Sequence, residues 1–327
     1  MDARRAGAAG LAVTPLALGL AALGRPGYIT EGREHDLGSQ RSPEDMEARA
    51  HAVLDAAWGA GVRYFDAARS YGQAEAFLAR WLTDRGIDPA ATTVASKWGY
   101  TYTAGWRIDA EVHEVKDHGL ATLRAQLAES RSELGDALDA YQIHSATLQT
   151  GVLEDGEVHA ELARLREAGV VIGFTTSGPA QADVVRRAVE VDVAGEPLFG
   201  LVQATWNPLE PSVGPALAEA ADAGLVVVVK EGLANGRLTE RGDAGRSGPL
   251  AAVAARLGTT PDAAALAAAM AQPWSDVVLS GAVTPAQVAA NAAAAQLEPD
   301  ADDLATLDAL AEPAEAYWQA RSARAWR

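Results

Sequence analysis

Short runs of apolar residues, each about the length of a buried β-strand, recur along the whole chain. Longer segments between them, such as Met46–Trp58 and Ala160–Ala168, carry the apolar pattern of amphipathic helices. The runs predict eight strands: Leu16–Leu20, Val62–Phe65, Thr93–Ser96, Ala140–Ile143, Val170–Phe174, Leu201–Ala204, Leu225–Val229 and Val277–Leu279. Strands and helices therefore alternate along the sequence.

This alternation predicts a parallel sheet, because parallel neighbours need a crossover of a dozen or more residues, usually a helix. Eight strands spaced near the ~30 residues of one βα unit favour a closed barrel over an open, doubly wound sheet. The open alternative also lacks its usual phosphate-binding motifs, since the sequence has no G-x-G-x-x-G after the first strand and no G-x-x-x-x-G-K-[ST]. We predict an α/β fold, a (β/α)8 TIM barrel that forms a single domain over residues 1–327.

Two connections are longer than the others, and long loops in a compact domain are usually functional or disordered. The loop 98–119 is rich in aromatic residues, and the loop 231–248 is rich in glycine and arginine. We expect both to lie over the barrel mouth. After the eighth unit, Ala301–Leu310 predicts a final helix, and we expect a C-terminal tail with Tyr317, Trp318 and Trp326 to fold back over the barrel.

The composition excludes several classes of function. The formal net charge of −17 repels nucleic acid and anionic membrane surfaces, so we expect neither as a partner. The chain has no cysteine, which excludes disulfides, iron–sulfur clusters, thiolate zinc sites and a cysteine nucleophile. One cluster of possible metal ligands combines His113 and Glu114 with Asp117 and His118. On a helix, two ligands five positions apart point about 140° apart, so we expect no metal.

The N-terminal stretch Ala6–Leu23 is apolar and follows Arg4 and Arg5, in the manner of a secretory signal. Pro15 interrupts the stretch, however, and no small-residue cleavage site precedes Arg25. No window of the chain holds the ~18 uninterrupted apolar residues that a membrane span needs. We interpret the stretch as a first strand and expect a cytoplasmic protein that does not bind membranes.

Ionisable residues follow several of the predicted strands, at the edge where a barrel places its active site. These residues are Asp66, Lys97, His144 and Lys230. Tyr71 lies five residues beyond Asp66. A free phenol has a pKa near ~10, and a neighbouring ammonium group lowers that pKa, while a buried carboxylate keeps the ammonium charged. We therefore interpret Tyr71, Lys97 and Asp66 as a tuned proton donor.

Several segments around these residues occur together in one known family. The segments are Gly61–Gly72 with Glu75, Ala95–Lys97, Tyr141–His144, Val202–Leu209 and Thr284–Asn291. The five-residue spacing from Asp66 to Tyr71, with Gly72 next, is the most specific feature. Over about residues 16–297 the sequence thereby resembles the aldo-keto reductase family. The resemblance implies a barrel that binds NADP or NAD and reduces aldehydes or ketones, or oxidises the matching alcohols.

The same resemblance implies a role for each residue at the barrel mouth. Tyr71 would be the general acid, Lys97 and Asp66 would tune it, and His144 would orient the substrate carbonyl. The implied contacts to the nucleotide are Gly19, Thr175, Thr176, Gln203, Lys230, Leu233, Gly236, Leu238, Gly281, Val283, Gln287 and Asn291. NADP-preferring members usually carry Arg or Lys near the last barrel helix, where this chain has uncharged residues. We expect NADP(H) from the family, with NAD(H) as the alternative because those basic residues are missing.

The substrate pocket is expected to be lined by aromatic residues of the loops, as many small-molecule sites are. The candidates are Tyr28, Trp98, Tyr100, Tyr102, Trp106 and Trp206. Arg25 and Arg107 are candidates for contact with an anionic substrate group. Two alternatives stay open: a nucleotide-binding sensor of the same fold with little turnover, and an unrelated barrel hydrolase or lyase with an imine on Lys97. The presence of all four residues of the implied catalytic group favours an enzyme.

Overall fold

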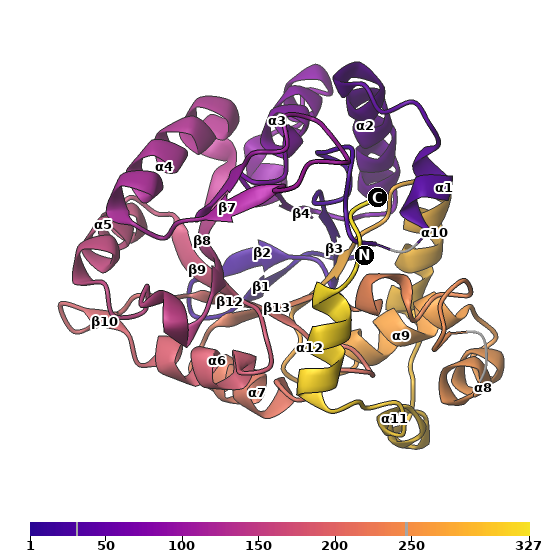
Figure 1. Cartoon of the computed structure of the whole chain (residues 1–327). Helices are drawn as coiled ribbons and strands as arrows, with labels where there is room; N and C mark the ends of the chain where they lie inside the picture. The colour runs from indigo at the N-terminus through magenta and orange to yellow at the C-terminus, as the bar shows by residue number, and fades with distance from the viewer. Residues whose placement is uncertain (31, 246–247) are drawn as a thin grey trace.

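Eight parallel strands close into a barrel in the computed structural model, which describes residues 1–30, 32–245 and 248–327. Each strand pairs in parallel with the next, and the last one returns to the first. The strands are β3 (Leu16–Gly19), β4 (Tyr64–Asp66), β5 (Thr93–Trp98), β8 (Leu138–Ala146), β9 (Val171–Thr176), β12 (Leu201–Thr205), β13 (Val226–Lys230) and β14 (Val277–Ser280). Each overlaps one of the predicted apolar runs, and the expected (β/α)8 TIM barrel is confirmed (Figure 1).

Helices surround the barrel, as Figure 1 shows. They are α1 (Arg33–Leu37), α2 (Pro43–Gly59), α3 (Ala74–Asp84), α4 (Leu120–Leu134), α5 (Gly156–Glu167), α6 (Gln181–Val189), α7 (Gly214–Asp222), α8 (Pro249–Arg256), α9 (Pro261–Met270), α10 (Pro285–Ala293), α11 (Ala301–Asp308) and α12 (Ala314–Ser322). Helix α2 begins where Ser42 accepts a hydrogen bond from the backbone N–H of Asp45 and Pro43 fixes the first turn. Apolar residues at helical spacing, among them Met46 and Val53, form its buried face.

The core lies on both sides of the barrel wall, because successive residues of a strand point to opposite faces. In β4, Phe65 packs outward against Trp81 of α3, with ring centroids 5.3 Å apart, whereas Tyr64 belongs to the cluster inside the barrel. Small and branched residues such as Ala17, Ala95 and Val228 fill that inner cluster. The barrel is therefore a packed core, and the strand ends rather than its centre are left for a site.

Three hairpins were not predicted from the sequence. Strands β1 (Arg4–Ala6) and β2 (Leu11–Val13) pair antiparallel, and the apolar side chains of β2 join the inner cluster at the amino-terminal end of the barrel. The stretch Ala6–Leu23 therefore holds a hairpin strand as well as the first barrel strand, and the interpretation as one strand is wrong. The other two hairpins are β6 (Tyr100–Tyr102) with β7 (Glu114–Lys116), and β10 (Asp192–Val193) with β11 (Glu196–Pro197).

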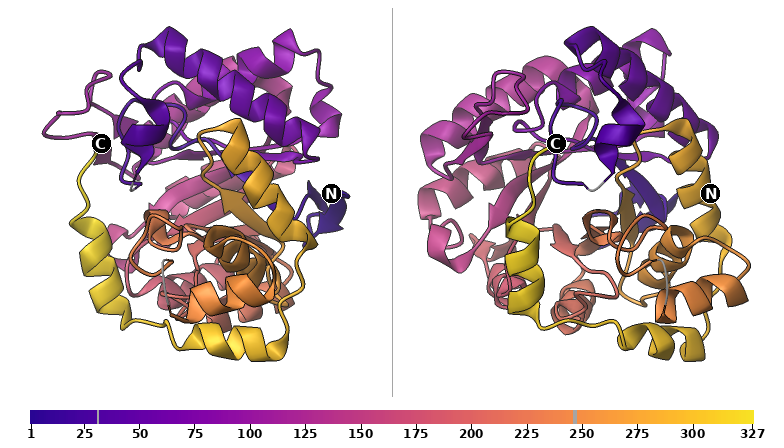
Figure 2. Two further views of the ribbon diagram at one scale, coloured as in Figure 1. Left: turned by 90° about the vertical axis from the view of Figure 1, so that its right-hand side faces the viewer. Right: turned by 45° about the vertical axis from the view of Figure 1, so that its right-hand side comes forward.

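The C-terminal segment passes along the outside of the barrel and returns to its mouth. Figure 2 shows it in yellow, running through α11 and α12 back towards α1. Tyr317 and Trp318 of α12 are buried, and the backbones of Tyr28 and Arg327 exchange two hydrogen bonds of 3.0 Å. The expected helix is present as α11 and the tail does return to the barrel, but α11 is not the final helix, because Tyr317 and Trp318 belong to α12, which was not predicted.

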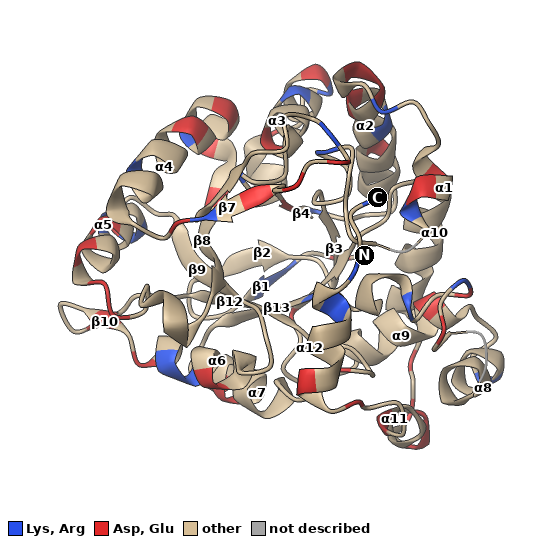
Figure 3. Ribbon diagram, viewed as in Figure 1, with Lys and Arg blue, Asp and Glu red and all other residues tan. Residues whose placement is uncertain are grey.

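Most charged residues belong to the outer helices and loops, while the barrel strands are largely uncharged (Figure 3). Among the described residues, no helix combines the length and the apolar character that crossing a lipid bilayer requires. Two charged residues of the barrel strands, Asp66 and Lys97, stand out against this background because they are almost completely buried.

Candidate active site

Four ionisable side chains meet at the carboxyl-terminal mouth of the barrel. Asp66 ends β4, Lys97 lies on β5 and His144 on β8, which are neighbouring strands, and Tyr71 follows in the turn after β4. The Lys97 ammonium donates to Oδ2 of Asp66 and lies 3.4 Å from the phenol oxygen of Tyr71. The same phenol oxygen lies 3.4 Å from Nε2 of His144. The structure therefore brings together the four residues singled out in the sequence, with the Tyr71 hydroxyl between a cation and an imidazole.

Asp66 is held by more partners than the sequence predicted. Its Oδ1 accepts hydrogen bonds from the side-chain amides of Gln203, at 3.0 Å, and Gln142, at 3.2 Å. Lys97 also donates to the backbone carbonyl of Ala67 at 2.9 Å. The amide of Gln203, expected to contact a nucleotide, is thus partly engaged with Asp66. Gln142 was missed, although it lies two residues from His144 on one strand and therefore points to the same face.

Burial sets the pKa values of this group. It raises the pKa of Tyr71 well above its ordinary value, and the negative charge of Asp66 raises it further. Arg25 acts to lower the pKa of Tyr71 but does not outweigh the desolvation of the phenolate, so the expected lowering of this pKa is not the net effect. Burial also lowers the pKa of Lys97, against the opposing effect of Asp66. Tyr71 is consequently a protonated phenol at neutral pH, as a proton donor must be.

His144 is a neutral imidazole at neutral pH. Burial lowers its pKa well below the ordinary value, and the positive charges of Lys97, Arg25 and Lys230 lower it further. Its ring packs edge-on against Tyr71 and Tyr100, with centroid distances of 5.4 and 4.9 Å. A neutral imidazole can accept or donate a hydrogen bond at Nε2 without adding a charge to the site.

Two glycines allow the turn that carries Tyr71. Gly72 has a φ of +64°, and a Cβ there would lie 2.4 Å from the carbonyl oxygen of Gly24. A Cβ at Gly24 would lie 2.2 Å from the carbonyl oxygen of Tyr71. The loop after β3 and the loop after β4 therefore touch through their backbones, which explains why glycine follows the tyrosine in the sequence motif.

Substituting Gly72 tests whether this contact positions Tyr71. Gly72→Ala forces the two loops apart, and we expect kcat for any substrate of the wild type to fall about 100-fold, because small displacements of a reacting group cost that much. Gly86→Ala is the matched control, since Gly86 has a φ of +58° but open space around its Cβ position. In Gly86→Ala the free energy of unfolding should fall by only ~1–2 kcal/mol, the cost of a left-handed backbone conformation for alanine, and kcat should be unchanged. Equal kcat in the two variants would contradict the positioning role.

A cavity of about 600 Å³ opens above these residues. It is lined by most of the positions implied for a nucleotide, namely Gly19, Thr175, Gln203, Lys230, Leu233, Gly236, Gly281, Val283, Gln287 and Asn291. Thr176 and Leu238 do not line it: the Thr176 hydroxyl lies 3.3 Å from Gln181, and Leu238 is fully buried in an apolar cluster. Both long loops contribute to the wall, the first through Tyr100 and Glu114 and the second through Glu231, Gly232, Leu233, Asn235, Gly236, Thr239, Glu240 and Arg241. Arg246 and Ser247 of the second loop lie outside the described residues.

Lys230 and its neighbour Glu231 are largely buried in this wall, with side chains 16% and 8% exposed. Lys230 donates a hydrogen bond of 2.7 Å to the hydroxyl of Thr205, and burial lowers its pKa to about 8. Burial acts to raise the pKa of Glu231, but the charges of Arg321 and Lys230 outweigh it and lower that pKa to about 2. The Arg321–Glu231 ion pair joins α12 to the loop after β13. Neither Glu231 nor Arg321 was predicted, because no local pattern relates residues 90 positions apart.

Only some of the aromatic residues predicted for the substrate pocket line the cavity. Tyr28 and Tyr100 are part of its wall. Trp98 is completely buried beside His118, and the indole N–H of Trp106 donates to the backbone carbonyl of Arg41 at 2.7 Å. These two residues and Tyr102 do not appear among the described residues of the cavity wall, so their assignment is corrected. Trp206 instead lines a separate hollow of about 310 Å³ with Trp274, and Arg107 is an exposed partner of Asp109.

Arg25 is a second cation beside the Tyr71 ring, after Lys97. Its guanidinium carbon lies 5.0 Å from the centre of that ring, and its side chain is 2% exposed. It donates to the carbonyl of Ser70 at 2.9 Å and to Glu114 of β7 at 2.8 Å. Its Nε has no hydrogen-bond partner among the described residues. Arg25 is thus a buried donor beside the Tyr71 ring, and its contact with an anionic substrate group stays a prediction.

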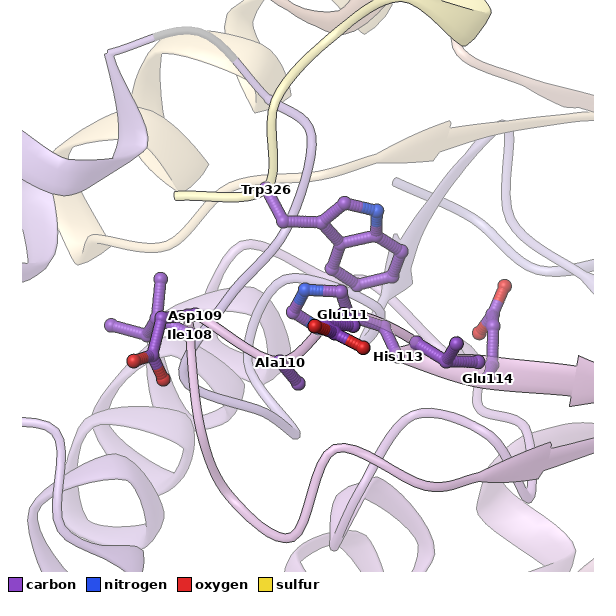
Figure 4. Close-up of a pocket in the computed structure, with 8 residues that line it drawn as sticks. Ile108, Asp109, Ala110, Glu111, His113, Glu114 and Trp326 are labelled. Atoms are coloured by element: carbon purple, nitrogen blue, oxygen red, sulfur yellow. The ribbon is translucent and has the colours of Figure 1, made fainter.

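The tail closes one side of the cavity. Figure 4 shows the indole of Trp326 beside His113, at the edge of a hollow of about 460 Å³ lined by 108–114. The two rings are stacked with centroids 4.1 Å apart and an interplanar angle of 6°. Trp326 also lies over Arg25, at 4.6 Å, so it packs between the 98–119 loop and the cavity.

The suspected metal ligands lie in a different element from the one assumed. Glu114 is part of strand β7 and His113 directly precedes it, so the helical spacing argument does not apply. The Nε2 atom of His118 lies 2.9 Å from the backbone carbonyl of His144. Over residues 1–30, 32–245 and 248–327, no group of three His, Asp or Glu side chains is arranged to hold a metal ion.

A sequence model of the aldo/keto reductase family matches residues 16–312. The chain belongs to the aldo/keto reductase family. The family expected from the sequence is thereby confirmed, and the match spans all eight barrel strands and the tetrad of Asp66, Tyr71, Lys97 and His144.

This aldo/keto reductase is similar to two curated relatives and to a solved structure. A D-threo-aldose 1-dehydrogenase from a Pseudomonas species is 30% identical over 66% of this chain and 65% of its own length. A pyridoxal 4-dehydrogenase from Microbacterium luteolum is 27% identical over 58% of each chain. The chain thus matches less than two thirds of each relative's length. Both are dehydrogenases, which agrees with the expected oxidoreductase class.

The solved structure is the holo form of an aldo-keto reductase from Bacillus halodurans. The two chains superpose with a TM-score of 0.72 at 22% identity, over 96% of this chain and 97% of the other. At this identity the likeness establishes the shared barrel fold alone.

Proposed function

We propose that the protein is an NAD(P)-dependent oxidoreductase that interconverts a carbonyl compound and the matching alcohol, with Tyr71 as the general acid or base. The observation that carries the proposal is the contact of the Tyr71 hydroxyl with both Lys97 and His144 at the floor of a cavity. A cavity of about 600 Å³ falls in the range of small-molecule and cofactor sites. The names of the two dehydrogenase relatives support the same class.

The cavity wall fits a nicotinamide nucleotide in its chemistry. Gln203 and Thr175 offer an amide and a hydroxyl beside the tetrad, where a carboxamide needs partners. Asn235 lines the wall further along, and its buried Oδ1 has no hydrogen-bond partner among the described residues. The loop Ser280–Val283 and Asn291 line the wall beyond β14. We propose that these residues hold the nucleotide, which supplies or accepts the hydride when bound.

The tetrad then handles the proton. In reduction, the Tyr71 hydroxyl donates its proton to the oxygen of the substrate carbonyl, and Lys97 stabilises the phenolate that forms. Asp66 holds the Lys97 ammonium in place, and the amides of Gln142 and Gln203 hold Asp66. His144 orients the carbonyl oxygen through Nε2 beside the Tyr71 hydroxyl. In oxidation the same atoms work in reverse, and the phenolate accepts the alcohol proton.

The substrate end of the cavity is polar and aromatic. Arg25 and Glu114 offer a guanidinium and a carboxylate, and the rings of Tyr28 and Tyr100 lie beside them. Vicinal hydroxyls can bond to such a pair, while the rings can cover apolar faces of a small cyclic molecule. We propose a small hydroxylated aldehyde or its cyclic hemiacetal as the substrate, a class that includes the aldose and the pyridoxal of the relatives' names.

The proposal is tested by adding NADH and NADPH separately and following the quenching of tryptophan fluorescence. Turnover is then followed as loss of the reduced-nicotinamide absorbance with aldehydes that include an aldose and pyridoxal. Binding of at least one nucleotide with turnover of at least one aldehyde is the expected result. Binding with no turnover of any aldehyde, and no reverse oxidation, would favour a nucleotide sensor. If neither nucleotide binds, the oxidoreductase proposal fails.

A further inference from the structure

A carboxylate stands at the end of the cavity that lies across the barrel from His144. Helix α10 follows β14, four strands away from β8 in the closed order, and Gln287 and Asn291 of α10 line the cavity. Asp36 of α1 lines the same end. Figure 1 shows α1 beside α10, on the opposite side of the barrel from β8. This end is therefore remote from the Tyr71 hydroxyl.

The Asp36 carboxylate is fixed by two neighbours. Its Oδ2 accepts a hydrogen bond of 2.7 Å from the amide of Gln287, and its Oδ1 lies 2.8 Å from Arg241. The orientation of Gln287 is set in turn, because its Oε1 accepts a 2.8 Å bond from the backbone N–H of Val283. The Asp36 side chain is 15% exposed. The charge is thus held at the cavity wall by contacts with α10 and with the 231–248 loop.

Charged groups of both signs surround Asp36, and the cations Arg33, Arg49 and Arg241 already have partners. Glu240 and Asp262 line the same part of the wall, and Arg241 is already paired with Asp36. Arg33, the other cavity-lining residue of α1, directs its guanidinium to backbone carbonyls, including those of Ala22 and Pro26. A dianionic phosphate at this end would meet these carboxylates at close range, whereas a neutral hydroxyl could donate a hydrogen bond to one of them.

A dinucleotide with its nicotinamide at Tyr71 must place its adenosine towards the remote end if it lies extended along the cavity. NADP differs from NAD only there, by a phosphate on the 2′-oxygen of the adenosine ribose. We infer that Asp36 makes the site selective for NAD(H), by accepting a hydrogen bond from a ribose hydroxyl and repelling the 2′-phosphate. This inference rests on the proposed function, because it requires that the cavity bind a nicotinamide nucleotide.

The test measures the dissociation constants of NADH and NADPH by tryptophan fluorescence, without any carbonyl substrate. The wild type should bind NADH more tightly than NADPH. Asp36→Asn should lower the ratio of the NADPH constant to the NADH constant by roughly 10-fold or more, because it removes one close charge repulsion. Asp36→Asn combined with Arg241→Gln should recover part of that ratio, since it also removes a positive charge that attracts the 2′-phosphate.

Glu34→Gln is the matched control. Glu34 lies on the same helix, pairs with Arg327 and is not part of the described cavity wall, so it changes the net charge equally at another place. It should leave the ratio of the two constants unchanged. Tighter binding of NADPH than NADH by the wild type, or equal ratios in Asp36→Asn and Glu34→Gln, would overturn the inference while leaving the proposed function intact. Failure of both nucleotides to bind would overturn the proposed function and the inference with it.

Discussion

Tyr71→Phe should abolish reduction while leaving nucleotide binding nearly intact. The variant keeps the ring and its edge-on contact with His144 but removes the hydroxyl that faces Lys97 and His144. Loss of a general acid lowers kcat by about 10²–10⁴-fold, and we expect a decrease in that range. The dissociation constant of the preferred nucleotide should change less than about threefold, because the hydroxyl acts on the substrate. Steady-state kinetics and fluorescence titration measure the two quantities.

Tyr64→Phe is the matched control for this experiment. Tyr64 begins β4, is completely buried, and its hydroxyl has no hydrogen-bond partner among the described residues. The same atom is thus removed from the same strand region, but at the amino-terminal end of the strand. Wild-type kcat in Tyr64→Phe together with a large loss in Tyr71→Phe supports the assignment. Retention of turnover in Tyr71→Phe would remove Tyr71 as the acid.

Lys97→Met should have the second largest effect, on both stability and pH dependence. The ammonium contacts Asp66 inside the barrel, where both side chains are almost fully buried. Breaking one partner of a buried ion pair costs about 3–5 kcal/mol, so the free energy of unfolding should fall by that amount. The double variant Asp66→Asn with Lys97→Met leaves no unpaired charge. It should therefore recover a large part of the free energy of unfolding that Lys97→Met loses. Denaturant unfolding measures both variants, and equal losses in the two would contradict the ion-pair account.

The same variant tests how Tyr71 is tuned. Reduction requires the protonated phenol, so the rate falls as pH rises through the pKa of Tyr71. Burial already raises that pKa, and removal of the Lys97 cation raises it further. The fall should therefore occur at higher pH in Lys97→Met than in the wild type. Because the pKa of His144 lies well below its ordinary value, neither enzyme should show a His144 titration between about pH 6.5 and 8. An unchanged pH–rate profile would mean that Lys97 does not tune Tyr71.

The barrel could be predicted from the sequence because its strands are nearly continuous apolar runs separated by amphipathic helices. Val226–Lys230 is one such run, and parallel strands buried on both faces require this pattern. The tetrad followed, because residues after neighbouring parallel strands must share one edge of the sheet. The contacts that the sequence did not predict are those between segments far apart along the chain. The pairing of Glu231 with Arg321 and of Asp36 with Gln287 joins segments far apart in sequence, and no periodicity encodes such contacts.

The sequence also does not show which aromatic residues line the cavity and which are buried in the core. Trp98 ends β5 and Tyr100 begins β6 two positions later, yet Tyr100 lines the cavity and Trp98 is completely buried. Composition alone gives both the same claim to a substrate pocket, because tryptophan serves packing as readily as binding. The pKa of Tyr71 was misjudged for a related reason, since the cation beside it is visible in the sequence but the extent of its burial is not.

The most direct test of the account is to follow the hydride itself. The protein is incubated with an aldehyde and with NADH or NADPH that carries deuterium at the transferable position of the nicotinamide. The mass of the alcohol product is then measured by mass spectrometry. The account predicts one deuterium on the former carbonyl carbon of the product made by the wild type, and about 10²–10⁴-fold less product from Tyr71→Phe. Alcohol that carries no deuterium, or no alcohol with either nucleotide and any aldehyde tested, would contradict it.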